Sequence, residues 1–555
     1  MKIKGMRYVP INGGQWDNAK SYEHLVVVLY KGDSYISNKN VPAGVDITDI
    51  EYWSLFSNYN AQLDHLKQSL KEINLNSGII KNVAAYDILP NTNANLSDKI
   101  NKLISGGGIF YFPKGVYIID KPININSNTV IIGESATDTI FRCSVKMDCV
   151  EHSFCSSNAL NINARLCKNI ASGGYPGVDD ICQYYVHDVI LKNFTIDGNW
   201  QNRKIYNYDK EYQNNIIRER GSNLEIQRCY NWTVDGVNSI NGCQHNINVR
   251  AGAFSYGMGR DYTALYPSYN IEIINCYTNN QFADDGITTH DSYNILISDC
   301  VVECKNNING VNASAISNGI EIDDGSRYVT VQNCISRYNF CGFQAKGHID
   351  TPPAQHISFI NCIAENTNFG FSFACNDSNT DTLSDTYFNN DSKCYDITVS
   401  DCKIINPYSF NNSEDWRGQV HYFSLLNVAE INIKGLCVVD NLPTHNNVND
   451  TQNHLFMRSR GVCDRVNIEN VVITGDIESN TSFIQFDGES RNLNITNFTM
   501  GTFNSVKPLI SYNSTSQYGY CNIDKLIVRE LKNNKNIYSV AGTVKGWRTN
   551  CMTLY

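Results

Sequence analysis

Two aligned columns of polar side chains are the part of this sequence whose residue types suit acid–base chemistry. Six segments that begin with Gly or Asn share an alternation in which the second and fourth residues are mostly apolar. Because successive side chains of a strand point to opposite faces, the third and fifth residues should face outward. The third positions are Glu225, Asn248, Thr288, Glu321, Gln344 and Ser372, and the fifth positions are Gln227, Arg250, His290, Asp323, Lys346 and Ala374. We expect both columns to face solvent as one patch, acidic at its centre and basic at both ends.

The central acids, Glu321 and Asp323, are the first candidates for catalysis. A carboxyl separation of about 5–5.5 Å fits a retaining glycosidase and about 6.5–9.5 Å an inverting one, and side-chain rotamers decide between them. Two neighbouring acids should raise the pKa of one of them, which suits a general acid. His290, one coil away from Asp323, could orient or tune that acid or serve as a general base.

Cationic residues flank these acids. Arg250 and Lys346 suit a carboxylate, phosphate or sulfate group on a substrate. The remaining substrate-binding candidates are Glu225, Asn248, Gln344 and His348. The alternative is a salt-bridged outer ladder that only offsets like charges on adjacent strands.

A repeated strand pattern must position these columns. Five segments alternate apolar and polar residues and end in Cys276, Cys300, Cys334, Cys362 and Cys402, so that successive cysteines lie 24, 34, 28 and 40 positions apart. Weaker copies replace the Cys with Val, Leu or Phe, so we expect a buried interior stack of free thiols. The Asn or Asp before each Cys should turn the chain and bond the backbone of the neighbouring coil.

Such spacing predicts an all-β fold. Each coil cannot bury its apolar side alone, which favours stacked parallel strands. The preference for right-handed crossovers then predicts a right-handed parallel β-helix, a single-stranded solenoid.

The chain also divides into segments that differ in amino-acid composition and pattern. Residues 1–60 are rich in Trp and Tyr, which predicts a small β-module. Segments 27–36 and 49–55 resemble the small aromatic carbohydrate-binding modules of chitinases and phage fibres, which implies virion attachment or carbohydrate binding. Residues 61–78 predict a short neck helix because Leu and Ile recur at steps of 3, 4 and 3 residues. A single helix that caps the first coil is the alternative for this segment. We expect the β-helix over 79–504 and a C-terminal cap or trimerisation segment over 505–555.

The opening of the predicted β-helix resembles that of a known superfamily. A short helix near 96–104 is followed by Gly106-Gly-Gly-Ile-Phe-Tyr-Phe-Pro-Lys-Gly-Val-Tyr-Ile-Ile119. This succession resembles the pectate-lyase-like right-handed β-helices, especially the tailspike depolymerases of bacteriophages. The resemblance implies a virion tailspike or tail-fibre protein that is assembled in the host cytoplasm and is usually a homotrimer. It also implies a protein that binds and hydrolyses a bacterial surface polysaccharide and contacts other phage tail proteins through residues 1–60.

Another resemblance concerns two further acids. Asp284 and Asp285 resemble the paired Asp of polygalacturonase-like glycosidases, which adds them to the catalytic candidates. The other motifs of that family are not reproduced in place, and Gly347-His348 is a loose echo of its Gly-His-Gly.

Two alternatives and several exclusions complete the sequence-based picture. One alternative is a uronate lyase, in which Arg250 neutralises the carboxylate and His290 or Lys346 abstracts a proton; the other is a non-enzymatic receptor-binding or structural virion protein.

The net charge is −10, with no Lys/Arg run, which argues against nucleic-acid binding. No signal peptide or membrane-spanning run is visible. We expect no metal and no cofactor.

Overall fold

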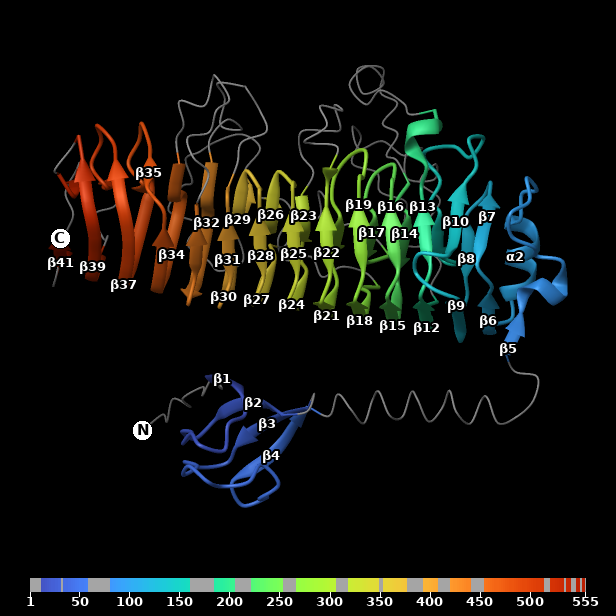
Figure 1. The fold of residues 1–555 in the computed structure, drawn as a ribbon, viewed down its shortest axis with the longest axis horizontal. Helices are drawn as coiled ribbons and strands as arrows, with labels where there is room; N and C mark the ends of the chain where they lie inside the picture. The colour runs from blue at the N-terminus through green and yellow to red at the C-terminus, as the bar shows by residue number, and fades with distance from the viewer. Residues whose placement is uncertain are drawn as a thin grey trace. The chain divides into compact units, whose positions relative to one another are not determined.

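The computed structural model describes two units of the chain. It covers residues 11–30, 33–57, 80–159, 184–204, 221–252, 266–305, 318–348, 353–376, 393–407, 420–440, 454–513, 520–533, 536–540, 546–549 and 552–554. The two compact units are Met1–Ile80 and Lys81–Tyr555 (Figure 1). The predicted neck helix over 61–78 lies outside the described residues. Each helix in these ranges is too short or too polar to cross a membrane.

The first unit is a small four-stranded sheet. Its strands are β1 (Ile11–Gln15), β2 (Val26–Tyr30), β3 (Asp33–Ser37) and β4 (Trp53–Ser57). β1 pairs with β2 in parallel, and the other pairs are antiparallel. Tyr22 and Trp53 pack edge to face in its core at 5.4 Å between ring centroids. Aromatic side chains therefore supply much of the apolar area that this small sheet buries. Its role in attachment or sugar binding stays a prediction.

The second unit opens with short elements that close the end of a long parallel sheet. These are β5 (Ile80–Asn82), η1 (Val83–Tyr86), α2 (Ser97–Ile104), β6 (Gly108–Phe112), β7 (Gly115–Ile119), β8 (Ile123–Ile125) and β9 (Thr129–Gly133). α2 buries Ile100 and Ile104 in the same core that runs through the following strands. The helix expected near 96–104 is confirmed.

Three strands make one coil, and each coil repeats the last. Most strands pair in parallel with the strand three positions further along the chain, so the unit is a solenoid, nearly all β. The strands of the first coils are β10 (Thr139–Cys143), β11 (Phe154–Ser156), β12 (Val186–Lys192) and β13 (Thr195–Asp197), with a short η4 (Trp200–Asn202) after them. Stacking of identical coils gives each strand two hydrogen-bonded neighbours.

The middle coils form three faces. One face, here called the site sheet, consists of β14 (Leu224–Gln227), β17 (Ile247–Arg250), β20 (Ile287–His290), β23 (Asn318–Asp323), β26 (Cys341–His348) and β29 (Phe369–Asn376). The second consists of β15 (Cys229–Asp235), β18 (Tyr269–Ile274), β21 (Tyr293–Ser298), β24 (Arg327–Gln332), β27 (Gln355–Ile360) and β30 (Cys394–Ser400). The third consists of β16 (Asn238–Ile240), β19 (Tyr277–Asn279), β22 (Val301–Glu303), β25 (Ile335–Arg337), β28 (Ile363–Glu365) and β31 (Lys403–Ile405).

The strands after residue 419 continue the stack. They are β32 (Val420–Lys434), β33 (Cys437–Val439), β34 (His454–Thr474), β35 (Ile477–Glu478), β36 (Ile484–Phe486), β37 (Glu489–Asn504), β38 (Ile510–Tyr512), β39 (Tyr520–Lys532), β40 (Tyr538–Val540), β41 (Gly546–Thr549) and β42 (Met552–Leu554). Parallel pairing passes the expected boundary at residue 505, since β37 pairs with β39 and β39 pairs with β41 and β42. A capping or trimerising role for 505–555 stays a prediction.

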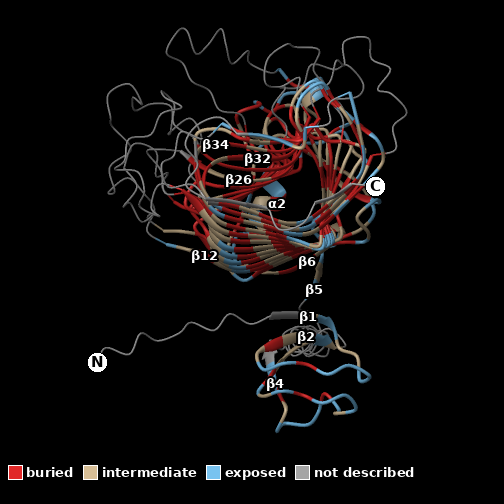
Figure 2. Cartoon of the chain, turned by 90° about the vertical axis from the view of Figure 1, so that its left-hand side faces the viewer, coloured by how far each residue is buried: buried red, intermediate tan, exposed pale blue. Residues whose placement is uncertain are grey.

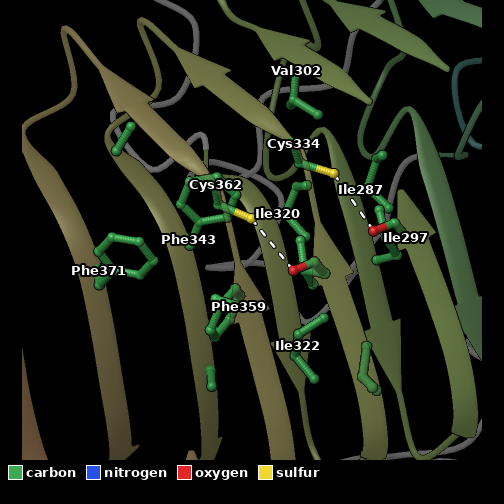
Figure 3. Packing of buried hydrophobic residues seen from close by; sticks show 14 of the residues in the cluster. Ile287, Ile297, Val302, Ile320, Ile322, Cys334, Phe343, Phe359, Cys362 and Phe371 are labelled. Atoms are coloured by element: carbon green, nitrogen blue, oxygen red, sulfur yellow. Dashed lines mark hydrogen bonds between the residues drawn. The ribbon is translucent and has the colours of Figure 1, made fainter. Parts of the chain in front are cut away.

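The cysteine column lies in the interior, as the sequence predicts. Cys276, Cys300, Cys334, Cys362 and Cys402 are each at most 2% exposed. In Figure 3, Cys334 and Cys362 lie among Ile320, Phe343 and Phe359, and their Sγ atoms contact carbonyl oxygens of the preceding coil at 3.6 and 3.4 Å. Burial raises the pKa of Cys300 and Cys402 well above the usual thiol value. These thiols are therefore packing groups, not nucleophiles.

A side-chain ladder joins several of the turns that precede these cysteines. Asn333 has a φ of +54°. Its Nδ2 donates to Asp299 Oδ1 at 3.2 Å, and its Oδ1 accepts from Asn361 Nδ2 at 2.9 Å. The turn prediction is confirmed, but the expected partner was wrong. The amides bond the side chain of the adjacent coil and not its backbone, because the Asn and Asp side chains at this position stack directly above one another.

This ladder makes a testable prediction for stability. N333A should lower the free energy of unfolding by about 1–2 kcal/mol, because Ala disfavours a left-handed backbone and makes no ladder hydrogen bond. N333G, the matched control, loses the hydrogen bonds but tolerates the backbone and should cost less. Urea unfolding measures both. Equal costs would show that the backbone conformation is unimportant.

Candidate active site

The strand register places both polar columns as the sequence predicts. Glu225, Asn248, Thr288, Glu321, Gln344 and Ser372 are successive partners across the site sheet, and so are Gln227, Arg250, His290 and Asp323. Parallel neighbours lie about 4.8 Å apart, so residues more than 20 positions apart in sequence become direct neighbours. The expected register is confirmed.

The expected exposure of these columns was wrong. Glu321 and Asp323 are 1% and 2% exposed, and β14, β17 and β23 are buried at every position. In Figure 2, β26 of this face and the later strands β32 and β34 are also mostly buried. In β12, by contrast, buried and more exposed residues alternate. Most outward side chains of the site sheet are therefore buried, and the central ones contact charged groups of neighbouring coils. Alternation of apolar and polar residues predicts which face of a strand packs on the core. It does not predict whether other residues cover the opposite face.

Lys346 joins the two central acids. Its Nζ lies 2.9 Å from Glu321 Oε1 and 3.0 Å from Asp323 Oδ2. Asn318 Nδ2 also donates to Glu321 Oε1 at 3.0 Å, and His290 Nε2 lies 3.6 Å from Asp323 Oδ2. The ammonium group of Lys346 is therefore engaged by the protein's own carboxylates, in place of the substrate anion that the sequence suggested. Gln344 occupies the column position after Glu321, and His348 is the last residue of β26.

The turn before β20 brings two more acids to this cluster. Asp284 has a φ of +67°, a left-handed conformation uncommon outside glycine. His245 Nε2 lies 3.7 Å from Asp284 Oδ2, and Gln244 Nε2 donates to the same oxygen at 3.1 Å. His245 Nδ1 lies 3.4 Å from Asp285 Oδ2 but accepts the backbone N–H of Asp285, at 3.3 Å. Asp284 and Asp285 therefore share a histidine.

Sequence reasoning missed His245, although a signal for it exists. Ile247 pairs with Ile287 across the site sheet. Continuing this register two residues backward places His245 opposite Asp285. The same rule that aligned the columns extends into the turns before the strands.

Asp285 and Glu321 form a buried carboxyl pair. Asp285 is 0% exposed, and neither of its carboxyl oxygens has a hydrogen-bond donor among the described residues. Glu321 lies close enough for each carboxyl group to shift the pKa of the other, and among the described residues Asp285 has no other polar partner that could satisfy its oxygens than a protonated carboxyl group. A hydrogen bond between two carboxyl groups requires a shared proton.

The electrostatics separate these acids into two kinds. Burial and then the charge of Asp284 raise the pKa of Asp285 to about 8. Burial and then the charge of Asp285 raise the pKa of Glu321 well above its usual value. Burial alone would raise the pKa of Asp284, but His245, Lys346 and the Gln244 hydrogen bond hold it below the usual value. At neutral pH the cluster thus holds an ionised carboxylate beside a protonated pair, the arrangement expected of a catalytic base or nucleophile with its acid.

Access to this cluster, here called the acid cluster (His245, Asp284, Asp285, His290, Glu321, Asp323 and Lys346), is uneven. The side chain of Asp284 is 38% exposed, that of Lys346 is 19% exposed and that of His290 is 11% exposed. Asp284 is therefore the carboxylate that an incoming substrate would meet first.

A second group of contacts engages the remaining candidates. Arg250 Nε contacts Glu225 Oε1, and Ser222 Oγ and Asn248 Nδ2 each donate to Glu225 Oε2 at 3.0 Å. The side chains of Arg250 and Glu225 are only 4% and 0% exposed. Arg250, Glu225 and Asn248 were expected to bind substrate at the surface, but the structure buries them and pairs them with one another.

The site offers ligand atoms for a metal in two places. His245, Asp284 and Asp285 have one such atom each within 4.8 Å of one another, and so do His290, Glu321 and Asp323. In the second group, the ammonium group of Lys346 already lies between the carboxyl groups of Glu321 and Asp323. Within each group, the two carboxyl groups therefore have oxygens at most 4.8 Å apart. This is closer than the separation of about 6.5–9.5 Å that an inverting glycosidase needs.

A groove lies on the same face, toward the N-terminal coils. Its volume is about 570 Å³, and it is lined by Asp98, Asn101, Asp120, Lys121, Pro122, Asn124, Asp148, Glu151, His152, Cys155 and Ala159. Asn124, Cys155 and Glu225 are successive partners in the strand register, so the groove continues the third-position column. His152 links the groove to the second group of contacts, since its Nδ1 lies 3.7 Å from Glu225 Oε2.

Comparison with known proteins relates the chain to phage appendages. No protein-family model matches it. It is 32% identical over 265 residues, 47% of its length, to the pre-neck appendage protein of Bacillus phage B103. It is 31% identical over 258 residues, 46% of its length, to that of Bacillus phage phi29. The matches span 26% of each relative's own length. Over about half of its length the chain is thus a homologue of phage pre-neck appendage proteins.

Two solved structures share its fold. The pre-mature gene product 12 of bacteriophage phi29 aligns with a TM-score of 0.65 and 21% identity, covering 88% of this chain and 58% of that chain. The A-module of a mannuronan C-5 epimerase from Azotobacter vinelandii aligns with a TM-score of 0.51 and 10% identity, covering 85% and 99%. At these identities the likeness shows the fold alone.

The buried proton predicts a pH-dependent stability. The pKa of Asp285 rises from 3.8 to about 8 on folding, so its stabilising contribution is complete below the unfolded pKa and is lost as pH rises through about 8. D285N carries no charge at any pH. It should therefore be more stable than the native protein at pH 9, by at least the 1.4 kcal/mol or so that corresponds to one pKa unit, and nearly equal to it at pH 4. Urea unfolding at the two pH values tests this; a difference that does not change with pH would contradict the raised pKa.

Proposed function

We propose that this chain belongs to a virion appendage, a tailspike or tail fibre, that binds a bacterial surface polysaccharide and hydrolyses it at the acid cluster. The homology to pre-neck appendage proteins of Bacillus phages supports the virion location and a Bacillus host. We further propose that the solenoid is right-handed and belongs to the pectate-lyase-like superfamily. The general preference for right-handed parallel crossovers supports the handedness.

One observation carries the enzymatic part of the proposal. Asp284 is ionised and partly exposed, while Asp285 and Glu321, directly behind it, hold a proton at neutral pH. Retaining the buried proton costs the protein stability at alkaline pH. Split pKa values within one cluster are a common property of catalytic acids and bases.

The short separation between these carboxyl groups favours a two-step hydrolysis. Asp284 Oδ forms a bond to the anomeric carbon while the glycosidic C–O bond breaks, and the leaving oxygen takes the proton of the Asp285–Glu321 pair. Water then attacks the anomeric carbon, gives its proton back to the pair and releases Asp284. Each of the two displacements inverts the anomeric carbon, so the sugar keeps its configuration overall. Lys346, fixed between Glu321 and Asp323, offsets the negative charge that the pair acquires when its proton leaves.

The two alternatives have less support. A lyase would need Arg250 to neutralise a uronate, but Arg250 is buried against Glu225. A receptor-binding or structural virion protein requires only the surface of the solenoid, for which the aligned groove of about 570 Å³ would suffice. This alternative gives no role to the partly exposed carboxylate of Asp284 beside the protonated pair.

Cleavage can be measured on isolated Bacillus cell walls. The purified chain should release soluble carbohydrate, and D284N should lower the rate by at least about a hundredfold, since the nucleophile is lost. E272Q, which neutralises a carboxyl of β18 on a different face, is the matched control and should leave the rate unchanged. Normal release by D284N would overturn the proposal. Binding to walls without release by the native protein would favour the non-enzymatic alternative.

We also propose that the chain is a homotrimer that contacts other phage tail proteins through residues 1–60. Resemblance to tailspikes supports both statements. Light scattering of the full chain should give about three times the 62.5 kDa of one chain. A mass of 62.5 kDa at every concentration tested would contradict the trimer.

A further inference from the structure

The histidine of the acid cluster is held by a chain of hydrogen bonds that leads away from the cluster. His290 Nδ1 lies 3.1 Å from Asn248 Oδ1, and Asn248 Nδ2 donates to Glu225 Oε2 at 3.0 Å. These three residues come from three successive strands of the site sheet, β20, β17 and β14. The amide of Asn248 therefore links the two groups of buried contacts.

The orientation of that amide follows from Glu225. Arg250 contacts one oxygen of Glu225, and Ser222 Oγ donates to the other. A buried carboxylate beside a guanidinium is ionised and can only accept hydrogen bonds. Asn248 must therefore turn its NH₂ toward Glu225, which leaves its carbonyl oxygen to face His290.

The protonation of His290 then follows from Asn248. A carbonyl oxygen accepts, so His290 Nδ1 must carry a hydrogen. Burial outweighs the charge of Asp323 and lowers the pKa of His290 to about 4, so the ring carries a single proton at neutral pH. The other charged or titratable groups acting on the ring are His245, Lys346 and Asp284. If Nδ1 holds the only proton, Nε2 is left with a lone pair, 3.6 Å from Asp323 Oδ2.

We infer that Glu225 and Asn248 are positioning residues that fix His290 as the neutral Nδ1–H tautomer and turn its Nε2 lone pair into the acid cluster. This assigns a role to two residues that contact no substrate. Nε2 is then an unprotonated hydrogen-bond acceptor in the cluster, in contact with Asp323 and within the field of Lys346. The use of Nε2 in catalysis rests on the proposed function; the tautomer itself does not.

The tautomer can be observed directly by nitrogen NMR. The full chain, labelled with ¹⁵N in its 11 histidines, is studied as a sedimented solid at pH 7, and the His290 signals are assigned by their loss in H290Q. The expected result is a protonated Nδ1 and a bare Nε2. A protonated Nε2, or a doubly protonated ring, would overturn the inference.

Two variants test whether Asn248 and Glu225 cause this state. N248L keeps the approximate size of the side chain but offers no acceptor, so His290 should move its proton to Nε2 and toward Asp323. E225Q keeps the shape of the carboxylate but no longer fixes the amide, so both tautomers should be populated; this second variant keeps the test informative if N248L does not fold. S372A, on the same column in β29, is the control and should leave His290 unchanged. An unchanged tautomer in E225Q, or in folded N248L, would contradict the positioning role.

The cell-wall assay separates this inference from the proposed function. If His290 acts as inferred, N248L should lower the rate by at least about tenfold, with a smaller loss in E225Q. If the native chain cleaves nothing but shows the Nδ1–H tautomer, then the proposed function fails and the positioning network stands.

Discussion

In-register parallel stacking is the constraint on which the rest of this structure depends. Each coil places its residues directly over those of the coil before it, at about 4.8 Å. The spacing tolerates little bulk where the strands of the site sheet begin. A Cβ on Gly319, for example, would lie 2.1 Å from Ser336 Oγ and 2.6 Å from the carbonyl oxygen of Gly342. Stacking is also what brings an acid of one coil, a histidine of the next and a lysine of a third within contact distance.

The same stacking creates the electrostatic problem that defines the site. Four carboxyl groups meet one lysine, and burying several negative charges together is costly. The cluster meets this cost partly by the ammonium of Lys346 and partly by keeping a proton on Asp285 and Glu321. Asp284, whose pKa lies below the usual value, is the most exposed of the four acids and is held in a left-handed backbone conformation. All four groups are carboxyl groups, so differences in position, burial and neighbouring charge alone decide which of them have a raised pKa and which have a lowered one.

Much of the fold and the whole register of the columns could be predicted from the sequence. Alternation with a repeated Cys or apolar residue marks the interior, and Asn at the turns marks where each coil bends, as the ladder of Asn333 and Asn361 confirms. The burial of Glu225 and Glu321 could not be predicted, because a strand pattern contains no information on what packs against its outer face. The partnership of Asp285 with Glu321 was also invisible, since it joins a turn residue of one coil to a strand residue of the next. The contact of His245 with Asp285 is predictable from the sequence, because the strand register continues into the turns before β17 and β20.

The central claim is that Asp285 and Glu321 share a proton although 36 positions separate them in the sequence. A double-mutant cycle measures this directly: the free energies of unfolding of the native protein, D285N, E321Q and the double variant are compared at pH 7. Residues that act through one buried hydrogen bond should show a coupling free energy of at least about 1 kcal/mol. Strictly additive effects would mean that the two carboxyl groups do not meet, and the acid cluster would then not exist as described.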